Sequence, residues 1–168
     1  MKDLRIRRFE NKDAKDVSNI ICRNFLEVNI KDYSEEKMKK LSEEFTEDKI
    51  LARSEISHMY VATVRNEVVG CGAISSYFGK EDESILLNIF VKPEFQGKGV
   101  GKKIIEALEK DEFFLRARRI EIPASITACE FYKKLGYSHK YNLKELDKEG
   151  NYRLEKFRYR LQYDQNYR

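Results

Sequence analysis

One short stretch decides the fold of this chain: Gln96-Gly97-Lys98-Gly99-Val100-Gly101. It follows an apolar run and the turn Lys92-Pro93-Glu94-Phe95, and it precedes apolar residues at helical spacing. Glycines let the backbone turn tightly and bring its N–H groups close to a ligand. The helix that follows offers unsatisfied N–H groups and the positive end of its dipole. The stretch therefore predicts a phosphate-binding turn between a strand and a helix, to which Lys98, Lys102 and Lys103 add positive charge.

Two common phosphate-binding loops do not fit this stretch. A Walker A loop ends in Gly-Lys-Ser/Thr, whereas Gly101 is followed by Lys102 and Lys103, with no hydroxyl for magnesium. The dinucleotide pattern GxGxxG fails because its third glycine would fall at position 102. A dinucleotide site should also open the first strand–helix unit, whereas several strands precede this turn. For the motif by itself, the alternative is a plain glycine-containing turn.

The apolar pattern along the whole chain predicts a mixed α/β fold in which helices cross over between strands. In chain order we expect a strand at 4–9, a helix capped by Asp13, a helix starting near Ser34, a helical piece around 50–51 followed by loop, a hairpin of 59–64 and 68–74 turning around 66–67, a strand at 85–91 covered on both faces, a helix with its apolar stripe at 100–108, a strand at 119–122, a helix at 126–135 stopped by Gly136, and strands at 137–141 and 154–163.

The 168 residues predict one domain spanning 1–168, and no linker-like segment divides them. The net charge of +4 is modest and does not by itself indicate nucleic acid. No apolar run reaches the roughly 18 residues of a membrane span, and the first residues contain no signal-like run. Three scattered cysteines and two histidines form no metal-binding pattern, so we expect no metal site and a cytoplasmic location.

The pattern Gln-x-x-Gly-x-Gly after a strand and a proline turn resembles a signature of the GNAT superfamily of N-acetyltransferases. About thirty residues further on, Ala128-Cys129-Glu130-Phe131-Tyr132-Lys133-Lys134-Leu135-Gly136-Tyr137 resembles the second landmark of that family, Ala-x-x-Phe-Tyr-x-x-x-Gly-Phe/Tyr. The two motifs cover roughly 85–137. The resemblance implies a GNAT-type fold: a central, mostly antiparallel, twisted sheet with a splayed parallel strand pair and helices on both faces.

The resemblance also implies acetyl-CoA as the cofactor, with its thioester between two parallel strands near Phe90 and 120–122. It assigns backbone contacts with the pantetheine arm and the acetyl group to the first strand, and the pyrophosphate to the glycine turn. Ser125 stands where the family often has an asparagine. The implied cofactor-binding residues are Ile89, Phe90, Val91, Gln96, Gly97, Lys98, Gly99, Val100, Gly101, Lys102 and Ser125.

By the same resemblance, Tyr132 matches the tyrosine that protonates the departing thiolate; the alternative is that it only packs. A phenol of pKa about 10 can donate to a thiolate whose conjugate acid has a pKa of about 8.5. A lysine-like amine has a pKa of about 10.4, so its deprotonation at neutral pH costs about 4–5 kcal/mol. Glu83 is a candidate general base, Asn88 a candidate for positioning the amine or a water, and we expect water-mediated deprotonation.

Several alternatives stay open at this stage. A non-catalytic acyl-CoA-binding sensor could use the same fold. The alternating basic and aromatic residues of 156–163 occur in nucleic-acid binders, but a strand with one buried face explains them, so we expect no nucleic acid. The acceptor amine carries no signature, although acidic residues at 35–48 could attract a cationic one. A homodimer is compatible with the sequence.

Overall fold

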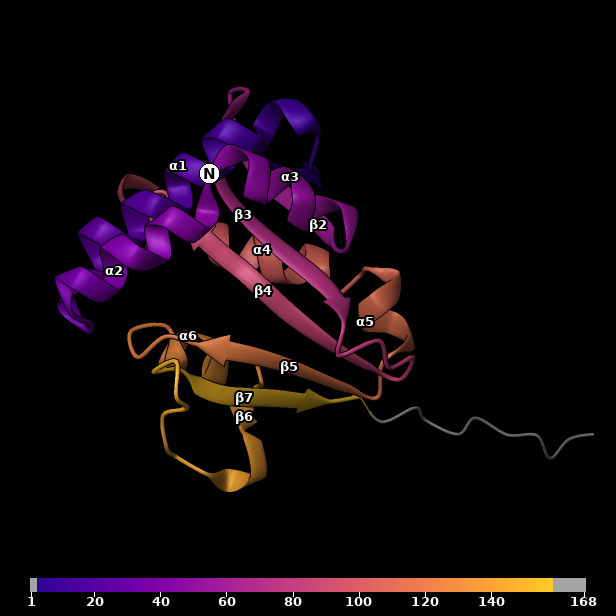
Figure 1. The fold of residues 1–168 in the computed structure, drawn as a ribbon. Coiled ribbons are helices and arrows are strands. Elements are labelled where there is room, and N and C mark those ends of the chain that lie inside the picture. Colours follow the sequence, from indigo (N-terminus) through magenta and orange to yellow (C-terminus); the bar gives the residue numbers. More distant parts are fainter. Residues whose placement is uncertain (1–2, 159–168) are drawn as a thin grey trace, which may run out of the picture.

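The computed structural model describes residues 3–158, which form one seven-stranded sheet covered by helices (Figure 1). The strand order is β1-β2-β3-β4-β5-β7-β6, and neighbouring strands are antiparallel except for the parallel pair β4–β5. This arrangement confirms the predicted fold class. The strands are β1 (Leu4–Arg8), β2 (His58–Val64), β3 (Glu67–Ser76), β4 (Glu83–Val91), β5 (Arg119–Ala124), β6 (Ser138–His139) and β7 (Tyr152–Phe157).

Helices cover both faces of the sheet, and α4 lies behind β3 and β4 in the view of Figure 1. The α-helices are α1 (Ala14–Arg23), α2 (Glu35–Ser42), α3 (Glu47–Glu55), α4 (Val100–Leu108), α5 (Glu112–Arg116) and α6 (Cys129–Lys134). A π-helical segment, Asn24–Val28, extends α1. No helix within residues 3–158 combines the length and the apolar character that a membrane span requires.

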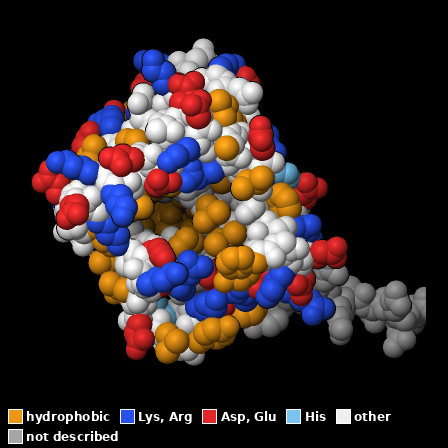
Figure 2. All heavy atoms as spheres, viewed as in Figure 1, with side chains coloured by type: hydrophobic (Ala, Val, Ile, Leu, Met, Phe, Trp, Pro, Cys, Tyr) orange, Lys and Arg blue, Asp and Glu red, His pale blue; other side chains and the backbone are white. Residues whose placement is uncertain are grey.

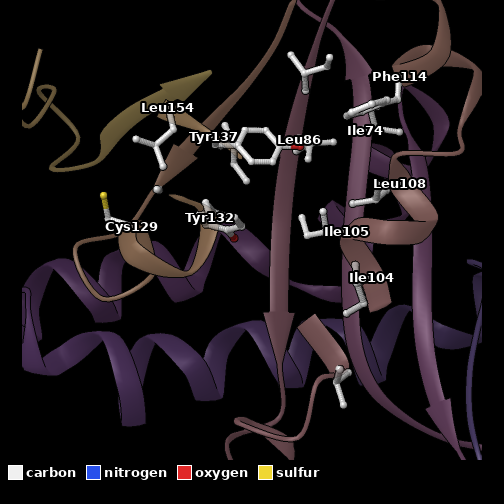
Figure 3. Close-up of a cluster of buried hydrophobic side chains, with 14 of the residues drawn as sticks. Ile74, Leu86, Ile104, Ile105, Leu108, Phe114, Cys129, Tyr132, Tyr137 and Leu154 are labelled. Atoms are coloured by element: carbon white, nitrogen blue, oxygen red, sulfur yellow. The ribbon is translucent and has the colours of Figure 1, made fainter. Parts of the chain in front are cut away.

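Two hydrophobic clusters lie on opposite faces of the sheet. One packs α1, α2 and α3 against residues such as Val61, and the other packs α4, α5 and α6 against residues such as Ala62. Successive residues of a strand point to opposite faces, which explains why these two neighbours of β2 belong to different clusters. Figure 3 shows the second cluster, where Ile104 and Leu108 of α4 lie against the sheet.

The N-terminal half differs from the prediction in the extent of its helices and in one turn. A 3-10 turn precedes α1, and the Asp13 carboxylate accepts from the Glu10 N–H group at 2.8 Å instead of capping α1. Helix α3 continues to Glu55, where we expected loop, because Ile50 is fully buried and anchors it. The β2–β3 turn is centred on 65–66, one residue earlier than predicted, and both residues have the positive φ of a type I′ turn.

The C-terminal half also departs from the prediction. Helix α5 was not predicted because its five residues are too few to show a periodic pattern. Strand β5 continues through Pro123 to Ala124, and α6 begins only at Cys129. Strand β6 is limited to two residues because the chain turns at Tyr141, whose φ is 54°. Strand β7 begins at Tyr152, earlier than expected, and the predicted strand residues 159–163 lie outside the described residues.

Candidate active site

The site is built where β4 and β5 separate. The two strands pair only from Glu83 to Ile85 on β4 and from Arg119 to Glu121 on β5. Beyond these positions the strands diverge, as Figure 1 shows, and the rest of β4 is paired with β3 alone. The splayed parallel pair that the resemblance implied is therefore present. It leaves one backbone edge of β4 without a strand partner in the middle of the sheet.

A β-bulge in β4 lies beside this gap. Cys71 of β3 faces Phe90 and Ala73 faces Leu87, so two residues of β4, Asn88 and Ile89, lie opposite the single residue Gly72. Asn88 has a φ of 54°, in the left-handed region. A Cβ at position 72 would lie 2.6 Å from Cγ2 of Ile104, so the opposing strand needs a glycine here. A bulge redirects the side chains of its strand, which is a common device beside functional sites.

Two cavities meet at the gap between β4 and β5. We call the first the turn cavity; it has a volume of about 460 Å³ and is lined by the glycine turn, β4 and the α6 region. The second, the helix cavity, has a volume of about 410 Å³ and is lined by α2, β4 and the loop before β7. Six residues line both cavities and form the neck between them: Asn29, Ile89, Phe90, Ser125, Ala128 and Tyr132.

The glycine turn has the geometry of an anion cradle. Gly97 and Gly99 have φ angles of 71° and 83°, which residues with a Cβ rarely adopt. The backbone N–H groups of 97–102 donate to no protein acceptor within residues 3–158, and α4 starts directly after Gly99. Val100, Gly101 and Lys102 also line the turn cavity. Unsatisfied N–H groups at the start of a helix attract negative charge, so the geometry of this turn suits an anion such as phosphate.

Gln96 lines the turn cavity, but its N–H group, which we expected to face the pyrophosphate, donates to the Pro93 carbonyl at 3.2 Å, and its side chain supports the turn. Its Nε2 donates to Oδ1 of Asn24 at 2.9 Å and to the Val91 carbonyl at 3.1 Å. Asn24 is buried, and its Nδ2 donates to the carbonyls of Ile20 at 2.8 Å and Val91 at 2.9 Å. The sequence analysis missed Asn24. Its signal was a polar residue on an otherwise apolar stripe, four residues after Ile20.

The lysines of the turn differ in their surroundings. Lys102 lines the turn cavity, and its Nζ is 4.0 Å from a carboxylate oxygen of Glu106. Lys103 pairs with the same carboxylate at 2.7 Å. Nζ of Lys98 lies 5.4 Å from the ring centroid of Phe95, and this residue does not line either cavity. Lys102 is therefore the lysine best placed to add positive charge beside the N–H groups.

Tyr132 projects from α6 into the neck. It is 5% exposed, and its ring packs against Phe131 and Tyr137 with centroid distances of 5.0 and 6.3 Å (Figure 3). Burial raises the pKa of its phenol above the usual value of 10.0, so the group stays protonated at neutral pH. The neighbouring Tyr137 hydroxyl donates to Glu109 at 3.3 Å, whereas Tyr132 lines both cavities. Tyr132 thus both packs in the core and presents a proton donor to the two cavities.

The remaining candidate residues lie in different places. Asn88 lines the helix cavity. Ser125 lies in the neck, where its Oγ accepts from the Ala128 N–H group at 3.3 Å. Glu83 lines neither cavity; it lies in the paired part of β4, where Lys80 and Arg119 each donate to it at 2.9 Å. The hydrogen bond from Lys80, with that from Arg119, lowers the pKa of Glu83 despite partial desolvation.

The splayed parallel pair and the glycine turn at its end are the two features of the site that the resemblance to the GNAT acetyltransferases implied. Residues 55–139 match the acetyltransferase (GNAT) domain family, which is half of the chain. The chain belongs to this family. The match includes both sequence motifs, the bulge and all the neck residues except Asn29.

Solved structures share the fold over most of the chain. The GCN5-related N-acetyltransferase from Rhodopseudomonas palustris is 25% identical, with a TM-score of 0.74 over 91% of this chain and 94% of that one. The PaiA N-acetyltransferase from Thermoplasma acidophilum, in complex with coenzyme A, is 19% identical, with a TM-score of 0.79 over 92% and 99%. A comparison with curated proteins found no match.

Proposed function

We propose that the chain is a single N-acetyltransferase domain, 1–168, that transfers the acetyl group of acetyl-CoA to a primary amine by direct attack in a ternary complex. The observation that carries this proposal is the meeting of two cavities at one neck beside Phe90 and Tyr132. In a direct transfer, donor and acceptor must be held at the same time with their reacting atoms in contact. The turn cavity would hold the donor and the helix cavity the acceptor.

The residues of the turn cavity fit a coenzyme A group. Among the described residues 3–158, the N–H groups of 97–102 have no protein acceptor and the space beside Gly97 and Gly99 is open, as a pyrophosphate requires. Lys102 would add charge, and the free edge of β4 at Ile89–Val91 would offer backbone groups to the pantetheine arm. Coenzyme A complexes of the same fold support this assignment. Acetyl-CoA, when bound, supplies an acetyl group activated as a thioester.

We assign the proton donor to Tyr132 and the positioning of the amine or a water to Asn88. The raised pKa keeps the phenol protonated, so it can hydrogen-bond to a thiolate leaving through the neck. Deprotonation of the amine would be water-mediated. Glu83 suits this task poorly because it lines neither cavity, and its two cationic partners lower its pKa. Ser125, which also lines the turn cavity, would contact the donor at the neck.

The test is to mix the protein with acetyl-CoA and a panel of primary amines and to follow the release of free thiol. We expect amine-dependent thiol release, with the acetylated amine detected by mass spectrometry in equal amount. Binding of acetyl-CoA without turnover over the whole panel would instead favour a non-catalytic acyl-CoA sensor. No binding of acetyl-CoA in calorimetry would refute both functions.

A further inference from the structure

We infer that the acceptor is an amine carried on an apolar body with an aromatic ring, and not a polyamine or another polycation. This inference rests on the proposed function and concerns the helix cavity alone. It follows from the side chains that form the wall of that cavity, from the charges that the wall offers, and from the position of its polar groups.

Aromatic rings dominate one side of the wall. The rings of Phe25 and Phe45 are 5.4 Å apart, and Phe25 meets Phe90 edge-on at 5.4 Å. Met38 and Leu41 of α2 extend this apolar surface. Figure 2 shows a hollow in this face of the molecule, lined by hydrophobic side chains and bordered by charged ones. Such a wall favours an apolar ligand and offers edge-to-face contacts to an aromatic ring.

The wall offers little charge to a cation. Among the described residues, its charged side chains are Lys37 and Glu149, one of each sign. Nζ of Lys37 contacts the carbonyl of Glu149 and lies 4.7 Å from the ring centroid of Tyr33. The acidic residues that could have attracted a polyamine are exposed and do not line the cavity: Glu35, Glu36, Glu43, Glu44, Glu47 and Asp48. A second ammonium group inside the cavity would therefore lose part of its hydration, and among the described lining residues only Glu149 has a carboxylate that could pair with it.

The cavity also has polar lining residues: Asn88 on β4, others at the neck, and others near the loop before β7, such as Asn151. Asn29, Ser125 and Tyr132 form the polar part of the neck, where the reacting amine must reach. At the side, the hydroxyl of Tyr33 donates to the carbonyl of Gly150 at 2.7 Å, next to the contact between Lys37 and Glu149. The apolar wall belongs to the same cavity of about 410 Å³, within the size range of small-molecule sites. An acceptor with its amine at the polar neck and its aromatic ring against α2 would match both the polar and the apolar parts of the cavity.

The experiment compares 2-phenylethylamine, tyramine and tryptamine with ethylamine, putrescine and spermidine as acceptors. We expect kcat/KM for the aromatic amines to exceed that for ethylamine and the polyamines at least tenfold, which corresponds to about 1.4 kcal/mol of transition-state binding. Saturation-transfer NMR with the protein and coenzyme A should detect binding of 2-phenylethylamine and a weaker signal, or none, for spermidine. This readout does not depend on turnover.

A charge placed in the wall tests the mechanism of selection. Leu41→Asp should lower kcat/KM for 2-phenylethylamine at least tenfold and raise that for putrescine, because it adds a carboxylate to the cavity. Leu115→Asp makes the same change at an exposed position of α5 and should alter neither value. If Leu41→Asp does not fold, the kcat/KM values of the unmodified protein for the six amines decide the inference.

The results separate this inference from the proposed function. Preference for polyamines or for ethylamine, in a protein that binds acetyl-CoA and turns over, would overturn the aromatic acceptor and leave the acetyltransferase intact. Equal effects of Leu41→Asp and Leu115→Asp on 2-phenylethylamine would show that α2 does not contact the acceptor. A protein that binds no acetyl-CoA would overturn the proposed function, and the acceptor class with it.

Discussion

Replacing Asn24 by alanine should weaken the fold and the glycine turn together. Its side chain makes three hydrogen bonds, to the carbonyls of Ile20 and Val91 and from Gln96, and so joins the end of α1, the end of β4 and the turn. Because Asn24 is buried, water does not fully replace the lost partners. Asn24→Ala should therefore also weaken coenzyme A binding at the glycine turn, although Asn24 carries no charge that could contact the ligand.

The size of the effect follows from these bonds. At about 1 kcal/mol net for each hydrogen bond, the loss is about 3 kcal/mol, and the better helix propensity of alanine returns about 0.5 kcal/mol. The expected destabilisation of about 2–3 kcal/mol corresponds to a fall in Tm of about 5–10 °C for a domain of this size. Gln96→Ala should cost about 1 kcal/mol because part of its contact is exposed. The double variant should show a coupling energy of about 1 kcal/mol.

Urea unfolding followed by circular dichroism measures the four corners of this cycle, and calorimetry measures their affinity for coenzyme A. Asn19→Ala, on the exposed face of the same helix, is the matched control and should change the free energy of unfolding by less than about 0.5 kcal/mol. Additivity of Asn24→Ala and Gln96→Ala within about 0.3 kcal/mol, together with unchanged affinity for coenzyme A, would refute the support of the turn by this pair.

Three further predictions follow from the neck, the turn and the buried charges. Tyr132→Phe should lower kcat about 100-fold with little change in coenzyme A affinity, and the raised pKa predicts no loss of phenol-dependent activity below pH 10 in the unmodified protein. Gly99→Val should abolish coenzyme A binding in calorimetry while circular dichroism stays native, because its φ of 83° strains a β-branched residue in an open turn. Glu121→Gln should destabilise the fold by up to about 3 kcal/mol at pH 7 in urea unfolding.

The pH dependence of Glu121 has a defined sign. Burial by itself would raise the pKa of its carboxyl, but hydrogen bonds from Arg119, Lys140 and Arg153 outweigh burial and hold the pKa below 4.5. Its contribution is therefore complete above pH about 4.5 and is lost as the pH falls through the lower, folded-state pKa. The Gln variant should show a shallower acid limb in its unfolding free energy. Identical acid dependence of the unfolding free energy in the two proteins would contradict the assignment for Glu121. Normal turnover of Tyr132→Phe would contradict the role of the phenol, and unchanged coenzyme A affinity of Gly99→Val would contradict the role of the turn.

Local patterns in the sequence were sufficient for most of the fold. The near-continuous apolar run at 85–91 predicted β4, and Gly136 ended α6 with a φ of 90°, as a helix-terminating glycine should. Ser34 caps α2 by accepting from the Lys37 N–H group. The turn at 96–101 was recognisable because its function depends on backbone conformation, which glycines encode directly.

Contacts between distant segments could not be predicted in the same way. The bulge at Asn88 of β4 lies opposite Gly72 of β3, and Gly72 in turn leaves space for Ile104 of α4. The Gln96 N–H group was expected to face the ligand but donates to Pro93, and the Gln96 side chain bonds to Asn24, 72 positions earlier in the chain. Glu83 is a candidate base by sequence, and only the structure shows that Lys80 and Arg119 of the neighbouring strand both pair with its carboxylate. Each of these roles is set by a partner that no local pattern identifies.

The gap between β4 and β5 also predicts that the stability of the protein depends on the proposed acyl donor. A free backbone edge inside a sheet is an incomplete structure, and a ligand that bonds to it completes the sheet as an additional strand would. A donor present at about 100 times its Kd would add about 2.7 kcal/mol to the free energy of unfolding. If the proposed donor binds there, the unfolded fraction should rise by about two orders of magnitude when the donor is removed.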